Sequence, residues 1–111
     1  MIDRKDRTMD LYKRIGAEVR FIKRMMCRFI VDSSKILYAP DTAKLMNTSR
    51  KMDAIISGME DQMFRDYPEL GHDYVNVFYG APDAETLNSV DAEVREIMAD
   101  MLRELMGGDP K

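Results

Sequence analysis

The strongest constraint on the fold of this chain is a heptad pattern between Thr8 and Leu37. Apolar residues recur there at steps of three and four, and only Ser33 interrupts them. The apolar set is Tyr12, Ile15, Val19, Ile22, Met26, Phe29 and Ile36. Such spacing places one apolar stripe along a helix and is typical of a helix packed against other helices. We therefore predict one long helix over residues 8–37, with Asp6 or Thr8 as its N-cap and with the later segments covering its stripe.

Two further segments have helical periodicity. The first covers residues 42–66 and follows Pro40, which should end the preceding helix because it disfavours helical geometry at the residue before it. Gly58 lies within this second helix and could mark a close approach of a neighbouring helix. The third helix is predicted over 84–106, with Asp83 as its N-cap. Its apolar residues are Leu87, Val90, Val94, Ile97, Met101 and Leu105.

An aromatic crossover, residues 67–82, separates the second and third predicted helices. It holds four of the nine aromatic residues and the only histidine, His72. Residues 74–79 have strand propensity, but the chain offers no second strand to pair with them. A short helical turn or an ordered crossover is therefore the favoured structure for this segment.

Length and composition favour a single helical domain over residues 1–111. A hydrophobic content of 45% in 111 residues is enough for one core. We expect an all-α fold, a three-helix up-down-up bundle, and a homodimer because the first helix is longer than the other two can cover. The apolar runs are too short to cross a membrane and the first residues lack the pattern of a secretory signal, so we expect no membrane association and a cytoplasmic location.

The net charge of −3 hides an asymmetry along the chain. Residues 1–30 contain nine Lys or Arg and four Asp or Glu, whereas residues 53–111 contain four and fourteen. The simpler interpretation is charge complementarity between helices packed within the chain. The alternative is a basic surface that binds an acidic partner.

No motif for catalysis, metal binding or cofactor binding stands out. Glu69 and His72 have a Glu-x-x-His spacing, but a dimetal site needs this motif on a helix and in two copies. Cys27 and Ser33 could act as nucleophiles only with His72 as a base, and neither has a catalytic motif beside it. We therefore expect no enzymatic activity, no metal and no cofactor.

The most informative predicted surface is a basic face on the first helix. Six cations fall on the side opposite the apolar stripe, where we expect the core not to use them: Lys13, Arg14, Arg20, Arg24, Arg28 and Lys35. Phe21 lies among them, and an apolar group flanked by arginines suits a protein contact. The predicted contact residues are Arg14, Phe21, Arg24 and Arg28, with Tyr74, Phe78 and Tyr79 as a second site.

These features favour a non-catalytic protein interaction module, such as an adaptor, inhibitor or regulator, whose partner presents an acidic surface. A nucleic-acid binder that uses the basic face is the alternative, although an isoelectric point near 5.2 weighs against it. A small-ligand sensor at the aromatic crossover, built around His72, Asp73 and Tyr79, is a third possibility.

Overall fold

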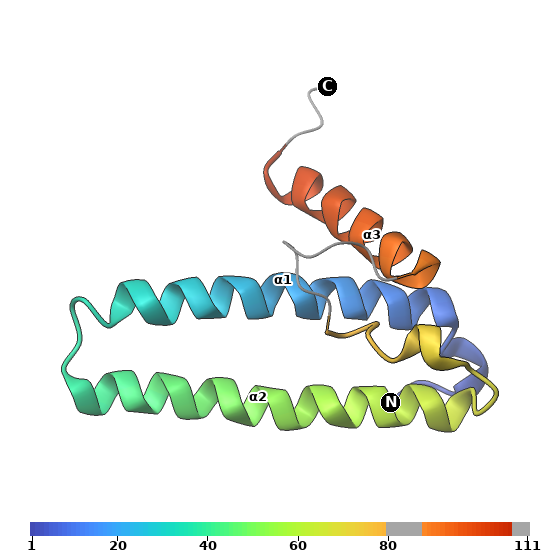
Figure 1. The fold of residues 1–111 in the computed structure, drawn as a ribbon, viewed down its shortest axis with the longest axis horizontal. Coiled ribbons are helices and arrows are strands. Elements are labelled where there is room, and N and C mark those ends of the chain that lie inside the picture. The colour runs from blue at the N-terminus through green and yellow to red at the C-terminus, as the bar shows by residue number, and fades with distance from the viewer. Residues whose placement is uncertain (80–87, 108–111) are drawn as a thin grey trace.

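The computed structural model describes residues 1–79 and 88–107. Within these residues every regular element is helical and no strand occurs, which confirms the predicted all-α fold (Figure 1). The helices, in chain order, are η1 (Arg4–Asp6), α1 (Met9–Ser33), α2 (Ala39–Asp66), η2 (His72–Tyr74) and α3 (Ser89–Leu105).

Helix α1 begins where one of the predicted caps stands but ends four residues early. The side chain of Thr8 accepts a hydrogen bond of 3.1 Å from the backbone N–H of Leu11. At the other end, Pro40 lies in the first turn of α2, where its missing N–H has no intrahelical acceptor to lose. Pro40 therefore starts α2 at Ala39 rather than at residue 42. The chain must complete its turn before Ala39, so α1 stops at Ser33 and not at residue 37.

Helices α1 and α2 lie side by side along their length, and residues 34–38 connect them at one end (Figure 1). Ion pairs mark the register between them. Arg7, just before α1, pairs with Asp66 at the end of α2, and Lys23 pairs with Asp53 near the middle. Helix α3 crosses α1 obliquely and diverges from it toward its C-terminal end (Figure 1).

The core occupies only one end of the hairpin made by α1 and α2. Its buried apolar residues are Tyr12, Ala17, Val19, Ile56, Met63, Val77, Phe78, Val90 and Val94. They come from the first half of α1, the second half of α2, the segment after η2 and the first half of α3. The radius of gyration of 16.0 Å exceeds the value of about 13 Å that a compact domain of this size would have. The other end of the hairpin extends beyond the core.

A close backbone approach occurs at Gly16, not at Gly58. A Cβ atom on Gly16 would lie 2.5 Å from the carbonyl oxygen of Val77, whereas a Cβ on Gly58 would meet no atom within 4 Å. The expectation of a close helix approach at Gly58 is therefore wrong. Gly16 instead allows the segment that follows η2 to lie directly on α1.

Half of the predicted apolar stripe remains uncovered. Tyr12 and Val19 are buried, but Ile22 is 43% exposed and Phe29 is 53% exposed. The stripe leaves the core at this point because α3 is anchored to the first half of α1, through Lys13 and Arg20, and diverges from there. Among the described residues, α2 is the helix that accompanies the second half (Figure 1). The expectation that later segments would cover the whole stripe is wrong.

The described part of the aromatic crossover, residues 67–79, contains a helical turn, one of the two structures that the sequence favoured. Residues 72–74 make a 3-10 turn and residues 75–78 continue as turns. Helix α3 begins at Ser89, where the Asn88 side chain accepts a hydrogen bond of 2.8 Å from the N–H of Asp91. The predicted start of this helix at residue 84 and its predicted cap, Asp83, lie outside the described residues.

Candidate interaction surface

An open groove separates α1 from α3 where the two helices diverge. It has a volume of about 460 Å³. Its lining residues are Arg14, Glu18, Phe21 and Ile22 of α1, with Met101, Glu104 and Leu105 of α3. A second hollow of about 370 Å³ continues the groove toward Asp10, Ile97 and Asp100 and shares three of its residues. The groove thus has apolar walls with charged residues at its rim.

A buried ion pair holds α3 against α1 beside this groove. The Arg20 guanidinium lies 2.8 Å from the Asp91 carboxylate, and the two side chains are only 3% and 2% exposed. Arg20 also donates hydrogen bonds to the carbonyl oxygens of Val77, at 3.2 Å, and of Asn76. Burial lowers the pKa of Arg20, while the adjacent Asp91 carboxylate acts in the opposite direction. One arginine therefore connects α1, the segment after η2 and α3.

A second cation of α1 reinforces the contact with α3. The Lys13 ammonium lies 2.9 Å from the Glu93 carboxylate and 5.8 Å from the centre of the Tyr74 ring. Lys13 and Arg20 are both buried, so the expectation that the core could not use these two cations is wrong. Their partners lie in the acidic part of the chain, in agreement with charge complementarity between packed helices.

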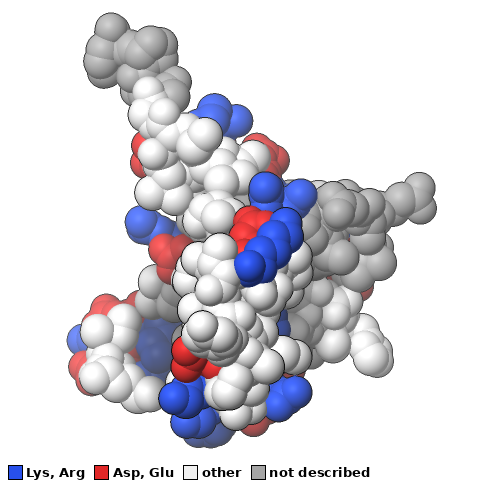
Figure 2. All heavy atoms as spheres, turned by 90° about the vertical axis from the view of Figure 1, so that its left-hand side faces the viewer, with Lys and Arg blue, Asp and Glu red and all other residues white. Residues whose placement is uncertain are grey.

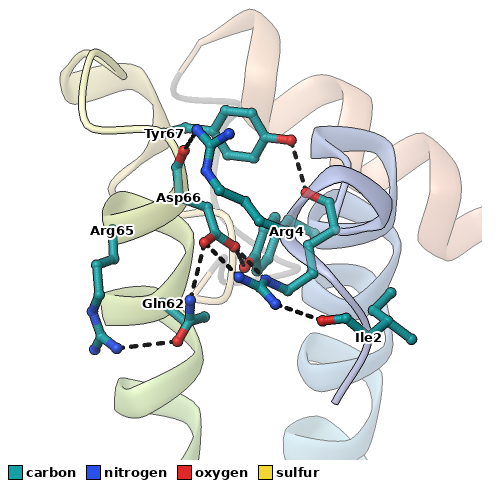
Figure 3. A network of polar contacts seen from close by, with 8 residues as sticks. Ile2, Arg4, Gln62, Arg65, Asp66 and Tyr67 are labelled. Atoms are coloured by element: carbon teal, nitrogen blue, oxygen red, sulfur yellow. Dashed lines mark hydrogen bonds and ion pairs between the residues drawn. The ribbon is translucent and has the colours of Figure 1, made fainter.

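The N-terminal segment is fixed to the end of α2 by a second polar network (Figure 3). Arg7 donates two hydrogen bonds to the Asp66 carboxylate, at 2.6 and 2.9 Å. The same carboxylate accepts from the Tyr12 hydroxyl and from the Gln62 amide. Arg4 donates to the Asp66 carbonyl oxygen and lies over the ring of Tyr67. All of these contacts lie at the core end of the hairpin.

These contacts change the acid–base properties of the network. The Arg7 guanidinium, and then the Tyr12 hydroxyl, hold the pKa of Asp66 well below its usual range. Burial, and then the Asp66 carboxylate, raise the pKa of Tyr12 to about 12. The network is therefore most favourable with Asp66 ionised and Tyr12 neutral.

An exposed apolar strip continues from the groove along α1. Ile22, Met25 and Phe29 are 43%, 47% and 53% exposed. Their spacing of three and four residues places them on one face of the helix. Leu105 and Met106 are exposed at the end of the diverging α3. The groove and the strip form one apolar surface with no third helix over it among the described residues.

The first predicted contact site is divided between the groove and the rest of α1. Arg14 and Phe21 line the groove, and Arg24 and Arg28 lie further along α1 with exposed side chains. Sequence reasoning missed the residues that make the surface apolar, because Ile22 and Phe29 were assigned to a covered stripe. The groove residues of α3 could not be found from the sequence, since their position depends on where α3 crosses α1.

The second predicted contact site is not a single surface. Phe78 is 1% exposed and belongs to the core, so it cannot contact a partner in the folded protein. Tyr74 is half-buried near Lys13, and only Tyr79, at 44%, is substantially exposed. Burial, and then Glu60, raise the pKa of Tyr79. Within residues 67–79 the buried members are Val77 and Phe78, and the prediction that Phe78 binds a partner is wrong.

Acidic and basic groups lie next to each other at the end of the molecule where residues 34–38 connect α1 to α2. Figure 2 shows Lys and Arg atoms close to Asp and Glu atoms on this face, separated by wide uncharged areas. Asp32 with Lys35 and Asp41 with Lys44 are two such pairs. This face has no uniform basic patch.

Within residues 1–79 and 88–107, no helix is long and apolar enough to span a bilayer. The same residues contain no group of three or more His, Cys, Asp or Glu side chains that could hold a metal ion. His72 and Cys27 are exposed on different elements, η2 and α1, and Ser33 is buried.

Comparison with known proteins gives no relative of this chain: no family model matches it, and no curated protein and no solved structure resembles it significantly.

Proposed function

We propose that this protein is a non-catalytic interaction module that binds a helix of a protein partner in the groove between α1 and α3. The observation that carries the proposal is the convergence of Arg14 and Phe21 with Met101 and Leu105 around one open groove. Apolar walls with charged rims are the usual site for the apolar face of an amphipathic helix. A role as an adaptor, inhibitor or regulator needs no more than this surface.

The partner helix should present apolar residues at intervals of three and four, with acidic residues beside them. The apolar residues would pack on Phe21, Ile22 and Met25 and displace water from their exposed surface. Acidic residues would pair with the exposed arginines Arg24 and Arg28. The homodimer expected from the long first helix belongs to the same proposal, because a second bundle would cover the exposed half of α1. We also propose the up-down-up order of the three helices.

Binding to nucleic acid is less favoured than binding to protein. Two of the six cations on the predicted basic face, Lys13 and Arg20, are used inside the fold. Of the others, Arg14 lies 3.9 Å from the Glu18 carboxylate and Lys35 lies 3.7 Å from the Asp32 carboxylate. A backbone of phosphates would meet these carboxylates as well as the arginines.

Capture of partners by tagged protein from its own lysate, with and without nuclease, tests the proposal. Replacing Phe21 and Arg28 together with alanine should lower capture of the protein partner by about tenfold or more. The matched control replaces Met46 and Lys51, an exposed apolar residue and an exposed cation on α2, outside the groove. Equal capture by both double variants, with helicity intact, contradicts the proposal. Loss of the captured material on nuclease treatment would favour the nucleic-acid alternative.

A further inference from the structure

A second heptad series runs along α1 beside the buried stripe. It advances by four, three, four, three and four residues through Arg14, Glu18, Phe21, Met25, Arg28 and Asp32. None of these six residues is buried. Such spacing aligns the side chains on one line of the helix surface, as in the seam of a coiled coil. Helix α1 thus carries a seam that the fold of one chain leaves open.

In this series, charged residues at equal distances before and after position 23 have opposite signs. Phe21 and Met25 form its apolar middle, around position 23. Glu18 and Arg28 lie five residues on either side of position 23, and Arg14 and Asp32 lie nine residues on either side. A second copy of the same helix, laid antiparallel in this register, would place each acid opposite a base. Phe21 would lie opposite the partner's Met25.

We propose that a second copy of this chain occupies the groove, with the two α1 helices antiparallel about a two-fold axis near position 23. The inference rests on the proposed function, because it assigns a partner to the same surface. Each interface of this symmetry contains every contact twice. It therefore has two Glu18–Arg28 pairs and two Arg14–Asp32 pairs around a central cluster of Phe21 and Met25.

The charged members of the series are only loosely engaged within one chain. The Arg14 guanidinium lies 3.9 Å from the Glu18 carboxylate, and the Lys35 ammonium lies 3.7 Å from the Asp32 carboxylate. Both pairs are exposed and join residues of one short stretch, so each contributes little to stability. These side chains can turn to a partner helix without the loss of a buried contact.

The groove also fits the far half of the partner's α1. In the proposed register the partner's Arg28 comes to Glu18 on the groove wall, where Glu104 of α3 adds a second carboxylate. An arginine that meets two carboxylates at the edge of an apolar hollow is favoured at protein interfaces, where arginine is enriched.

Charge reversal at the paired positions tests the register. Sedimentation equilibrium of the full chain should show a monomer–dimer equilibrium. Glu18→Arg places an arginine opposite Arg28 of the second copy. Arg28→Glu places a glutamate opposite Glu18 of the second copy. Each single variant should weaken the dimer by about tenfold or more, and the double variant should return to within about threefold of the original protein. Lys51→Glu, which reverses an exposed charge on α2 outside the groove, is the control, and circular dichroism checks that every variant is folded.

Two outcomes overturn the inference. One is a wild-type chain that stays monomeric at high concentration. The other is a dimer that the single reversals leave unchanged or that the double reversal does not restore. A monomeric chain would also remove the homodimer from the proposed function, whereas binding of a different protein is tested separately, by its capture and the dependence of that capture on Phe21. Conversely, the variant with both charge reversals could dimerise again but capture no other protein. That result would support the dimer and would count against binding of a helix from a different protein.

Discussion

The Arg20 guanidinium and the Asp91 carboxylate form an ion pair of 2.8 Å in a site where neither side chain reaches the solvent. The two residues are 71 positions apart in the sequence, and they join the middle of α1 to the first turn of α3. Because Arg20 also donates to backbone carbonyls of residues 76 and 77, the charge pair fixes three segments at once.

Replacing Asp91 with alanine should lower the free energy of unfolding by about 3–5 kcal/mol, because it leaves the Arg20 charge buried without its partner. Asp53→Ala is the control. Its carboxylate, half exposed, pairs with Lys23, which is not buried either, and its loss should cost no more than about 1 kcal/mol. Urea denaturation followed by circular dichroism measures both. If Asp91→Ala does not fold, the double variant Arg20→Met with Asp91→Leu should restore a cooperative transition. Equal effects of the two single variants would show that burial of the pair is unimportant.

Alanine at the two helical glycines should have opposite effects. At Gly16 the added methyl group meets the backbone of Val77 at 2.5 Å, so the segment after η2 must move, at a cost of about 1–3 kcal/mol. At Gly58 the methyl group enters open space, and the higher helix propensity of alanine should raise stability by about 0.5–1 kcal/mol. Thermal unfolding shows directly whether each variant is more or less stable than the original protein. A stabilised Gly16→Ala variant would contradict the close approach.

Stability should fall in acid through Asp66. Its pKa is lower in the folded protein than in the unfolded chain, so folding is favoured by its ionised form. The contribution is fully present above the unfolded pKa of about 3.9 and is lost as the pH falls from there through the folded pKa. The Asp66→Asn variant should be less stable near neutral pH and should lose less stability on acidification. Chemical denaturation at a series of pH values measures this, with Asp32→Asn as an exposed control.

The two neighbouring aromatics Phe78 and Tyr79 should respond very differently to alanine. Phe78→Ala removes a ring that is 1% exposed and should cost about 3–5 kcal/mol of stability. Tyr79→Ala removes a ring that is 44% exposed and should have a much smaller effect. Differential scanning calorimetry compares the two. A small effect of Phe78→Ala would restore this residue as a candidate for partner contact.

The helices were predictable from the sequence because their apolar periodicity is a local property. Thr8 was found as a cap for the same reason: an N-cap is recognised within one turn. Pro40 shows the limit of this reasoning. Proline breaks a helix that precedes it but is also favoured in the first turn of the helix that follows, and the sequence alone did not decide between the two roles.

The parts that were missed depend on which segments meet. Periodicity identifies Ile22 and Phe29 as members of an apolar face, but it does not say whether a helix will cover that face. Likewise, Lys13 and Arg20 look like solvated cations until Glu93 and Asp91 are placed beside them, and those partners lie more than 70 residues away. The groove itself exists only because α3 diverges from α1, and no local pattern encodes that angle.

The restriction of the core to one end of the hairpin has a consequence for how this protein can diverge in evolution. Among the described residues, the buried Arg20–Asp91 pair and the buried core residues all lie outside the turn at residues 34–38 and the helix halves that lead to it. Seven residues make close to two turns of an α-helix. Insertion or deletion of seven residues in both α1 and α2 would therefore leave the remaining side chains on nearly the same faces of their helices. The part of the hairpin that extends beyond the core can thus lengthen or shorten by whole heptads while the core stays intact. Only the surface that this part presents to a partner changes.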